Sequence, residues 1–147
     1  MELEANEVAT IPGVDKSFDV SAYELEDTAT LTVQNIARDD DMQYDGKPVQ
    51  VVIYSPGSKQ GVRALHKSSQ LAQLRMQALF RGKADKKGAE QADAERADKL
   101  TMITQGFINF PADPRTIYSN PKMIDFADQV ESFFSDKSNF SKVSTPT

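Results

Sequence analysis

Histidine, cysteine and clustered carboxylates carry much of the catalysis and metal binding in proteins, and this sequence is poor in the first two. Its 147 residues include one histidine, His66, and no cysteine. A thiol nucleophile, a thiolate metal site and a disulfide are therefore excluded. An activated nucleophile also needs a base at a supporting spacing, and His66 has no such partner along the sequence. We interpret His66 as a surface or boundary residue of a helix, and we expect no enzymatic activity and no cofactor.

Two short segments resemble ligand-binding loops without completing them. Residues 41–46 place carboxylates before Gly46 as a calcium loop does, but the twelfth position, which requires a bidentate glutamate, is Val52. Gly57-Ser58-Lys59 lies between a predicted strand and a predicted helix, where free N–H groups could bind phosphate. The Gly-Lys-Ser/Thr order of a Walker motif does not occur there. We interpret the first segment as a solvated hairpin loop and the second as a strand-to-helix turn.

Positive charge is concentrated in one part of the chain. Residues 59–87 carry eight Lys or Arg residues against one acid and have a net charge of +7, whereas residues 1–46 have a net charge of −10. Such a chain can neutralise itself, or it can pair the acidic region of one copy with the basic region of another. The basic residues that we expect to contact a partner are Lys59, Arg63, Lys67, Arg75 and Arg81.

Nucleic acid is another partner that these basic residues could contact, through its phosphates. However, Phe80 is the only aromatic residue between positions 59 and 87, so stacking on bases is not supported. The whole chain has a net charge of −5 and a pI near 4.9, and it would repel nucleic acid elsewhere on its surface. We therefore favour an acidic protein segment as the partner, with a solvated helix face as the plain alternative. A nucleic-acid-binding regulator is the third hypothesis.

The N-terminal sequence bears on where the protein works. Glu2, Glu4 and Glu7 occupy positions where a signal peptide would have basic residues followed by an apolar run. No stretch of the chain approaches the ~20 apolar residues of a membrane span. We therefore expect a protein that stays in the cytoplasm of the cell that makes it and does not enter a membrane.

Hydrophobic periodicity predicts the elements that position these residues, beginning with a hairpin. Residues 28–36 and 48–54 alternate apolar and polar side chains and are rich in β-branched residues, which is typical of strands. The acidic residues 37–47 between them predict a long loop, so that the two strands form a β-hairpin. Residues 1–22 lack either periodicity, and we predict an extended acidic arm.

Three helices are predicted after the hairpin. Ser58 is a predicted N-cap, and an apolar stripe follows it for about 20 residues at spacings of three and four. A second helix is predicted from Ala92 to about Asn109, and a third begins at Asn120-Pro121 and has an aromatic face over residues 123–134. The core positions predicted from these stripes are Leu65, Ala72, Met76, Leu79, Leu100, Ile103, Phe107, Val130 and Phe134.

These elements predict an α+β fold in which an N-terminal β-hairpin packs with about three α-helices. We expect one domain over residues 23–140, since 147 residues are enough for a single core. The arm of residues 1–22 precedes the domain. A flexible tail rich in Ser, Thr and Pro follows it over residues 141–147.

The order of these elements also resembles a known group of proteins. A strand reading Asp-Thr-Ala-Thr-Leu-Thr-Val at 27–33 leads through Gly-Lys-Pro at 46–48 into a second strand. Ser-Pro-Gly-Ser at 55–58 and the basic helix come next, and the chain later has Asn139-Phe140 after its last helix. In this order the chain resembles small morphogenesis proteins of tailed bacteriophages, including tail assembly chaperones. It departs from them in its acidic segment between the strands and in lacking a tryptophan in the second helix.

The resemblance implies a protein that binds other phage proteins and is not an enzyme. A tail assembly chaperone would hold the tape-measure or tail-tube protein in the host cytoplasm. A virion component, such as a capsid decoration, connector or minor tail protein, is the alternative, and its acidic arm would reach neighbouring subunits. Self-association is compatible with either role. Beside the basic helix, the residues expected to contact a partner are Phe126, Phe133 and Phe140.

Overall fold

The computed structural model describes residues 18–82 and 88–142 of the chain. Most of the predicted arm (1–22) and of the predicted tail (141–147) lies outside the described residues. The part of the arm that is described contains one turn of 3-10 helix, η1 (Val20–Tyr23). Asp19 caps this turn by accepting a hydrogen bond from the Ser21 N–H at 2.9 Å. The hydrogen bonds from Ser21 hold the pKa of Asp19 below its usual value.

The predicted hairpin is confirmed and forms two strands of a three-stranded antiparallel sheet. Strand β1 (Thr28–Thr32) pairs with β6 (Gln50–Tyr54), and β7 (Thr104–Ile108) pairs with the other edge of β6. The central strand alternates partly buried and buried side chains, and Val51 and Ile53 are fully buried. This alternation is the period of two that the sequence predicts for a strand with one face on the core.

The acidic connection between β1 and β6 is more ordered than the long loop we predicted. It folds into two short hairpins, which pair β2 (Gln34–Asn35) with β3 (Asp40–Asp41) and β4 (Gln43–Tyr44) with β5 (Lys47–Pro48). Backbone hydrogen bonds join Val33 to Val49 and to Met42 where the two hairpins meet. The predicted strand 28–36 is thus interrupted at Val33, whose buried side chain anchors this junction.

The second predicted helix is too long, because its last part is a strand. Helix α3 (Gly88–Ile103) ends at Ile103, and β7 follows without a connecting loop. Strand β7 contains Gly106, which disfavours a helix, together with aromatic and β-branched residues, which favour a strand. Pairing of Val51 with Phe107 and of Val52 with Gly106 gives these residues backbone partners on β6. The helical spacing of apolar residues continues to Phe107, but pairing with β6 makes residues 104–108 a strand.

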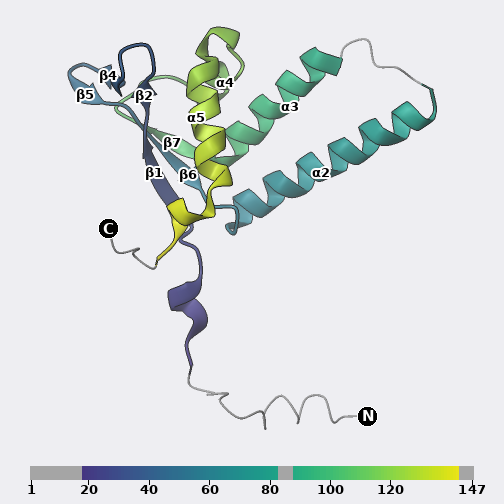
Figure 1. The fold of residues 1–147 in the computed structure, drawn as a ribbon, viewed down its shortest axis with the longest axis horizontal. Coiled ribbons are helices and arrows are strands. Elements are labelled where there is room, and N and C mark those ends of the chain that lie inside the picture. The colour runs from purple at the N-terminus through teal and green to yellow at the C-terminus, as the bar shows by residue number, and fades with distance from the viewer. Residues whose placement is uncertain (1–17, 83–87, 143–147) are drawn as a thin grey trace.

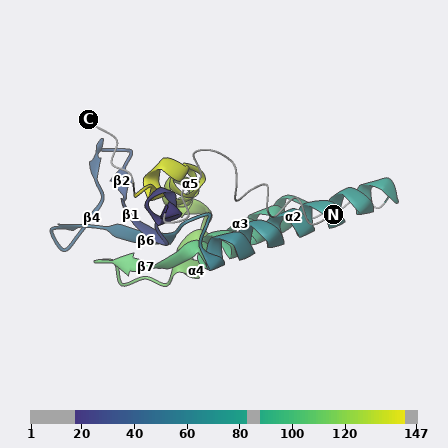
Figure 2. The same ribbon diagram turned by 90° about the horizontal axis from the view of Figure 1, so that it is seen from below.

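The other helices match the prediction more closely. Helix α2 (Lys59–Phe80) begins after its predicted cap Ser58. The predicted third helix is η2 (Pro121–Met123) followed by α5 (Ile124–Ser135), and a final turn η3 (Lys137–Phe140) follows. A short helix that we did not predict, α4 (Pro114–Tyr118), is capped by Asp113. Helix α5 packs on β6, α3 packs on α4 and α5, and α2 projects away from the sheet beside α3 (Figures 1 and 2).

Burial agrees with the predicted core in α3 and α5 and disagrees with it in α2. Leu100, Ile103, Val130 and Phe134 are buried, and Phe107 is partly buried in an aromatic cluster. The prediction is wrong for four residues of α2, which are exposed, because α3 packs against a different face of that helix. These four residues are Leu65, Ala72, Met76 and Leu79.

Candidate protein-binding surface

The start of α2 is held firmly against the end of β6. The Ser58 hydroxyl accepts a hydrogen bond from the Gly61 N–H at 3.0 Å and donates to the Ser55 carbonyl at 2.6 Å. Gly61 lies so close to Ser55 that a Cβ on it would be 1.9 Å from the Ser55 carbonyl oxygen. The helix therefore leaves the sheet in a direction set by Ser58 and Gly61.

One face of α2 is occupied by α3. Ala64 is buried, and Ser68 and Leu71 are partly buried on this face. Further along, the Arg75 guanidinium forms an ion pair and hydrogen bond with Glu95 of α3. Arg75, which we expected to bind a partner, is therefore already paired within the chain.

A second face of α2 is apolar and exposed. The residues of the predicted stripe recur at alternating spacings of three and four, which is the heptad spacing of helices that pack against other helices. Val62, Leu65, Met76 and Leu79 are 54%, 42%, 56% and 63% exposed. At about 100° per residue, this face lies roughly 100° around the helix from the face that α3 covers. We call it the apolar stripe, and it consists of Val62, Leu65, Ser69, Ala72, Met76 and Leu79.

A third face of α2 is basic. Lys59, Arg63 and Lys67 project from the half of the helix nearest the sheet, and all three are exposed. They form no ion pair with any residue in the described part of the chain. Arg81 follows the helix and is also exposed. Four of the five predicted basic contact residues are thus available to a partner, on a different face from the apolar stripe.

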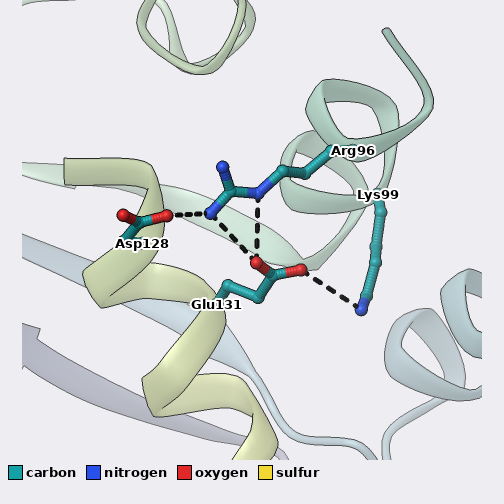
Figure 3. Close-up of polar contacts among 4 residues, drawn as sticks. All are labelled: Arg96, Lys99, Asp128 and Glu131. Atoms are coloured by element: carbon teal, nitrogen blue, oxygen red, sulfur yellow. Dashed lines mark hydrogen bonds and ion pairs between the residues drawn. The ribbon is translucent and has the colours of Figure 1, made fainter. Parts of the chain in front are cut away.

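Helix α3, which supports α2, is tied to α5 by an ionic network (Figure 3). The Arg96 guanidinium pairs with Asp128 and, at 3.0 Å, with Glu131. Lys99 lies 3.8 Å from the other Glu131 oxygen. Partial burial disfavours the charged form of Arg96 and by itself would lower its pKa. The two carboxylates outweigh this effect and raise the pKa of Arg96 above its usual value. The network fixes the position of α3 on the domain.

The predicted aromatic contact residues are placed mostly inside the domain. Phe126 and Phe140 are buried in the core, and Phe133 is partly buried with its ring 5.5 Å from that of Phe140. Phe126 on α5 and Phe140 at the end of η3 both belong to the hydrophobic core, so in this fold they present almost no surface to a partner. Phe80, at the end of α2, is the most exposed large hydrophobic side chain among the described residues, at 85%, and our prediction did not include it.

The Gly57-Ser58-Lys59 turn has a structural role, and His66 has no hydrogen-bonding or ionic partner among the described residues. The Ser58 hydroxyl of Gly57-Ser58-Lys59 is used in capping α2. His66 is exposed on α2 and makes no hydrogen bond or ion pair with a described residue. Among residues 18–82 and 88–142, no three or more His, Cys, Asp or Glu side chains are grouped to hold a metal ion. No helix in these ranges has the length and apolar character needed to cross a membrane.

Comparison with known proteins identifies no relative: no protein-family model, curated protein or solved structure matches the chain. Function must therefore be inferred from the geometry of the chain itself, in which α2 is the feature that stands apart from the packed domain.

Proposed function

We propose that this chain is a non-enzymatic, protein-binding component of tailed-bacteriophage assembly, most like a tail assembly chaperone, and that it binds its partner through α2. The observation that supports this proposal is the apolar stripe, which presents four large side chains to solvent along one helix face. Exposed apolar side chains gathered along one face of a helix are typical of sites that bind other proteins. The partner that it fits is an apolar helix, packing by the heptad spacing of the stripe.

The basic face of α2 favours a partner that carries acidic residues. Lys59, Arg63 and Lys67 have no described ion-pair partner, whereas Arg75 is satisfied by Glu95. A partner with acidic residues beside its apolar ones would gain steering and specificity from these bases. A chaperone holds an aggregation-prone partner, and α2 would cover the apolar surface of such a partner until assembly.

Variants of the stripe test whether it is the binding surface. Leu65→Gln, Met76→Gln and Leu79→Gln combined remove the apolar side chains and keep residues with good helix propensity. Ile36→Gln with Ile124→Gln is the control, because both side chains are exposed and lie outside α2. Affinity for the purified tape-measure and tail-tube proteins of the encoding phage would be measured for the wild type and both variants. We expect the affinity of the stripe variant to fall about 100-fold, on the order of 1 kcal/mol for each apolar side chain replaced. The affinity of the control should change little.

The same proteins and purified particles decide between the two assembly roles. Absence of the chain from purified virions, by mass spectrometry, is the result expected for a chaperone. Hundreds of copies in each virion would overturn that role in favour of a structural component. Binding of neither protein, or equal binding by the wild type and the stripe variant, would overturn the proposal that α2 binds either protein.

A further inference from the structure

We propose that a second copy of this chain covers the apolar stripe in the free protein, and that the two α2 helices pack side by side in opposite directions. This pairing goes beyond the proposed function, because it concerns the protein before a phage partner binds. A phage protein that occupies the stripe would have to displace the second copy.

The apolar stripe is a helix-packing surface that the described fold leaves open. Its four large side chains keep 42% to 63% of their surface exposed, along about 26 Å of helix at 1.5 Å per residue. Helix α3 packs on a different face, where Ala64, Ser68 and Leu71 lie. A helix laid on the stripe therefore displaces no packed side chain, and the ion pair between Arg75 and Glu95 stays within the chain.

The sequence of the stripe is complementary to itself when the second helix runs in the opposite direction. A two-fold axis midway along the stripe places these residues of the two copies opposite each other: Val62 and Leu79, Leu65 and Met76, and Ser69 and Ala72. Large side chains thus meet large ones toward both ends. The small residues meet at the centre, where they allow the helix axes to approach closely. Both copies use the same surface, which is the requirement for a closed two-fold dimer.

The two ends of α2 add a contact that only this direction makes. Lys59, the first residue of the helix, is exposed and forms no ion pair with a described residue. Phe80, the last residue, is 85% exposed. At about 100° per residue, both side chains flank the stripe on the side away from α3, so that Phe80 of one copy lies beside Lys59 of the other. An ammonium group within about 6 Å of an aromatic ring is attracted to the face of the ring.

The placement of charge and of the sheets is compatible with opposite directions. Arg63 and Lys67 lie near the base of α2, on roughly the opposite side of the helix from the stripe, so they stay in water in the pair. Because α2 projects from the sheet (Figure 1), an antiparallel pair places the two sheets at opposite ends. A parallel pair would bring both sheets to one end, where the helix axes are only about 8–10 Å apart.

The surface is large enough for a dimer that exchanges. Val62, Leu65, Met76, Leu79 and Phe80 are 42% to 85% exposed, which for side chains of this size leaves on the order of 100 Å² each. Two copies therefore bring together about 1,000 Å² of apolar surface, which is the lower limit for a specific protein–protein contact. Contacts of this size are transient, so a phage protein that offers more surface can replace the second copy.

Engineered cysteines report the direction of pairing, since the chain has none of its own. Val62→Cys and Leu79→Cys proteins would be oxidised separately and as an equal mixture. A disulfide joins only residues whose Cα atoms lie within about 7 Å, so we expect cross-linked dimer to form at least about fivefold faster in the mixture than in either protein alone. Leu74→Cys is the control, because Leu74 is 60% exposed on the far side of α2, and it should not cross-link in any combination.

Sedimentation measures the pairing without a cross-link. At about 100 μM, well above the micromolar Kd expected of such a contact, the wild type should sediment as a dimer. Leu65→Gln, Met76→Gln and Leu79→Gln combined should sediment as a monomer, because the replaced side chains form the interface. Ile36→Gln with Ile124→Gln should remain a dimer, because both side chains lie outside α2.

A monomeric wild type at this concentration would overturn the inference. Cross-linking of Val62→Cys alone as fast as in the mixture would also overturn it, because the helices would then be parallel. A dimer that survives in the stripe variant would place the interface elsewhere. Failure here leaves the proposed function standing if the stripe variant still loses affinity for the tape-measure or tail-tube protein. A dimer that forms as expected in a chain that binds neither protein would instead contradict the proposed function alone.

Discussion

Tyr118 brings a titratable hydroxyl into the aromatic cluster of the core. Its ring packs against Phe107 and Phe126, and its hydroxyl is 2.6 Å from the Thr104 hydroxyl. Burial raises the pKa of Tyr118 to about 12, and the hydrogen bond with Thr104 opposes this only in part. The neutral phenol is therefore the form that the folded protein accommodates.

This shift predicts a loss of stability at high pH. The Tyr118 hydroxyl loses its proton near the usual pKa of about 10 in the unfolded chain and near 12 in the folded chain. The contribution of the neutral Tyr118 to the stability of the folded state is therefore fully present below pH 10 and is lost as pH rises toward 12. The loss should be on the order of 2 to 3 kcal/mol in the free energy of unfolding. Urea unfolding at pH 8, 10 and 12 would measure it. Tyr118→Phe should flatten the curve relative to the wild type, and parallel curves for the two proteins would contradict the assignment.

At the scale of elements, Gly61 determines how α2 leaves the sheet. A helix interior normally favours Ala over Gly by about 1 kcal/mol. A Cβ at this position, however, would meet the Ser55 carbonyl oxygen at 1.9 Å, and that atom belongs to backbone that cannot rotate away.

We therefore predict that Gly61→Ala destabilises the protein although it raises helix propensity. Displacement of α2 from β6 should cost about 1 to 3 kcal/mol, as overpacking does, measured by urea unfolding. Gly106→Ala is the matched control, because nothing lies within 4 Å of a Cβ there. A Gly61→Ala protein as stable as the control would show that the helix can shift without cost.

At the scale of the whole molecule, Arg96 joins α3 to α5 and thereby connects the projecting helices to the domain. Arg96→Met keeps an aliphatic side chain but leaves Asp128 and Glu131 without their shared guanidinium. We expect a loss of about 1 to 2 kcal/mol at low salt and less at 0.5 M salt.

Arg115→Met provides the comparison for this measurement, because Arg115 makes a single, more exposed pair with Asp98 at 2.6 Å. It should cost no more than about 1 kcal/mol, the usual value of a surface ion pair. Double-mutant cycles with Asp128→Ala and Glu131→Ala would assign the difference to the network. Equal losses for Arg96→Met and Arg115→Met would mean that the network adds nothing beyond a single surface pair.

Most elements of this fold could be predicted from the sequence because their signals are local. Alternating β-branched residues predict β1 and β6, and Ser58 predicts the start of α2. Asn120-Pro121 predicts the start of the third helix, which the structure divides into η2 and α5. The basic face of α2 was equally visible, since it depends only on residue type and helical spacing. The α+β class follows from these elements, and the structure confirms it.

Only the tertiary structure decided where two segments with clear apolar patterns belong. Thr104–Ile108 became a strand because β6 offers it a free edge, and no local signal reports that edge. Four residues of the α2 stripe were predicted as core and Phe126 of α5 as a partner contact, yet those four are exposed and Phe126 is buried. Periodicity shows that one face of a helix is apolar, but what covers that face depends on the path of the rest of the chain. Here that path packs α5 on the sheet and leaves the stripe of α2 in solvent.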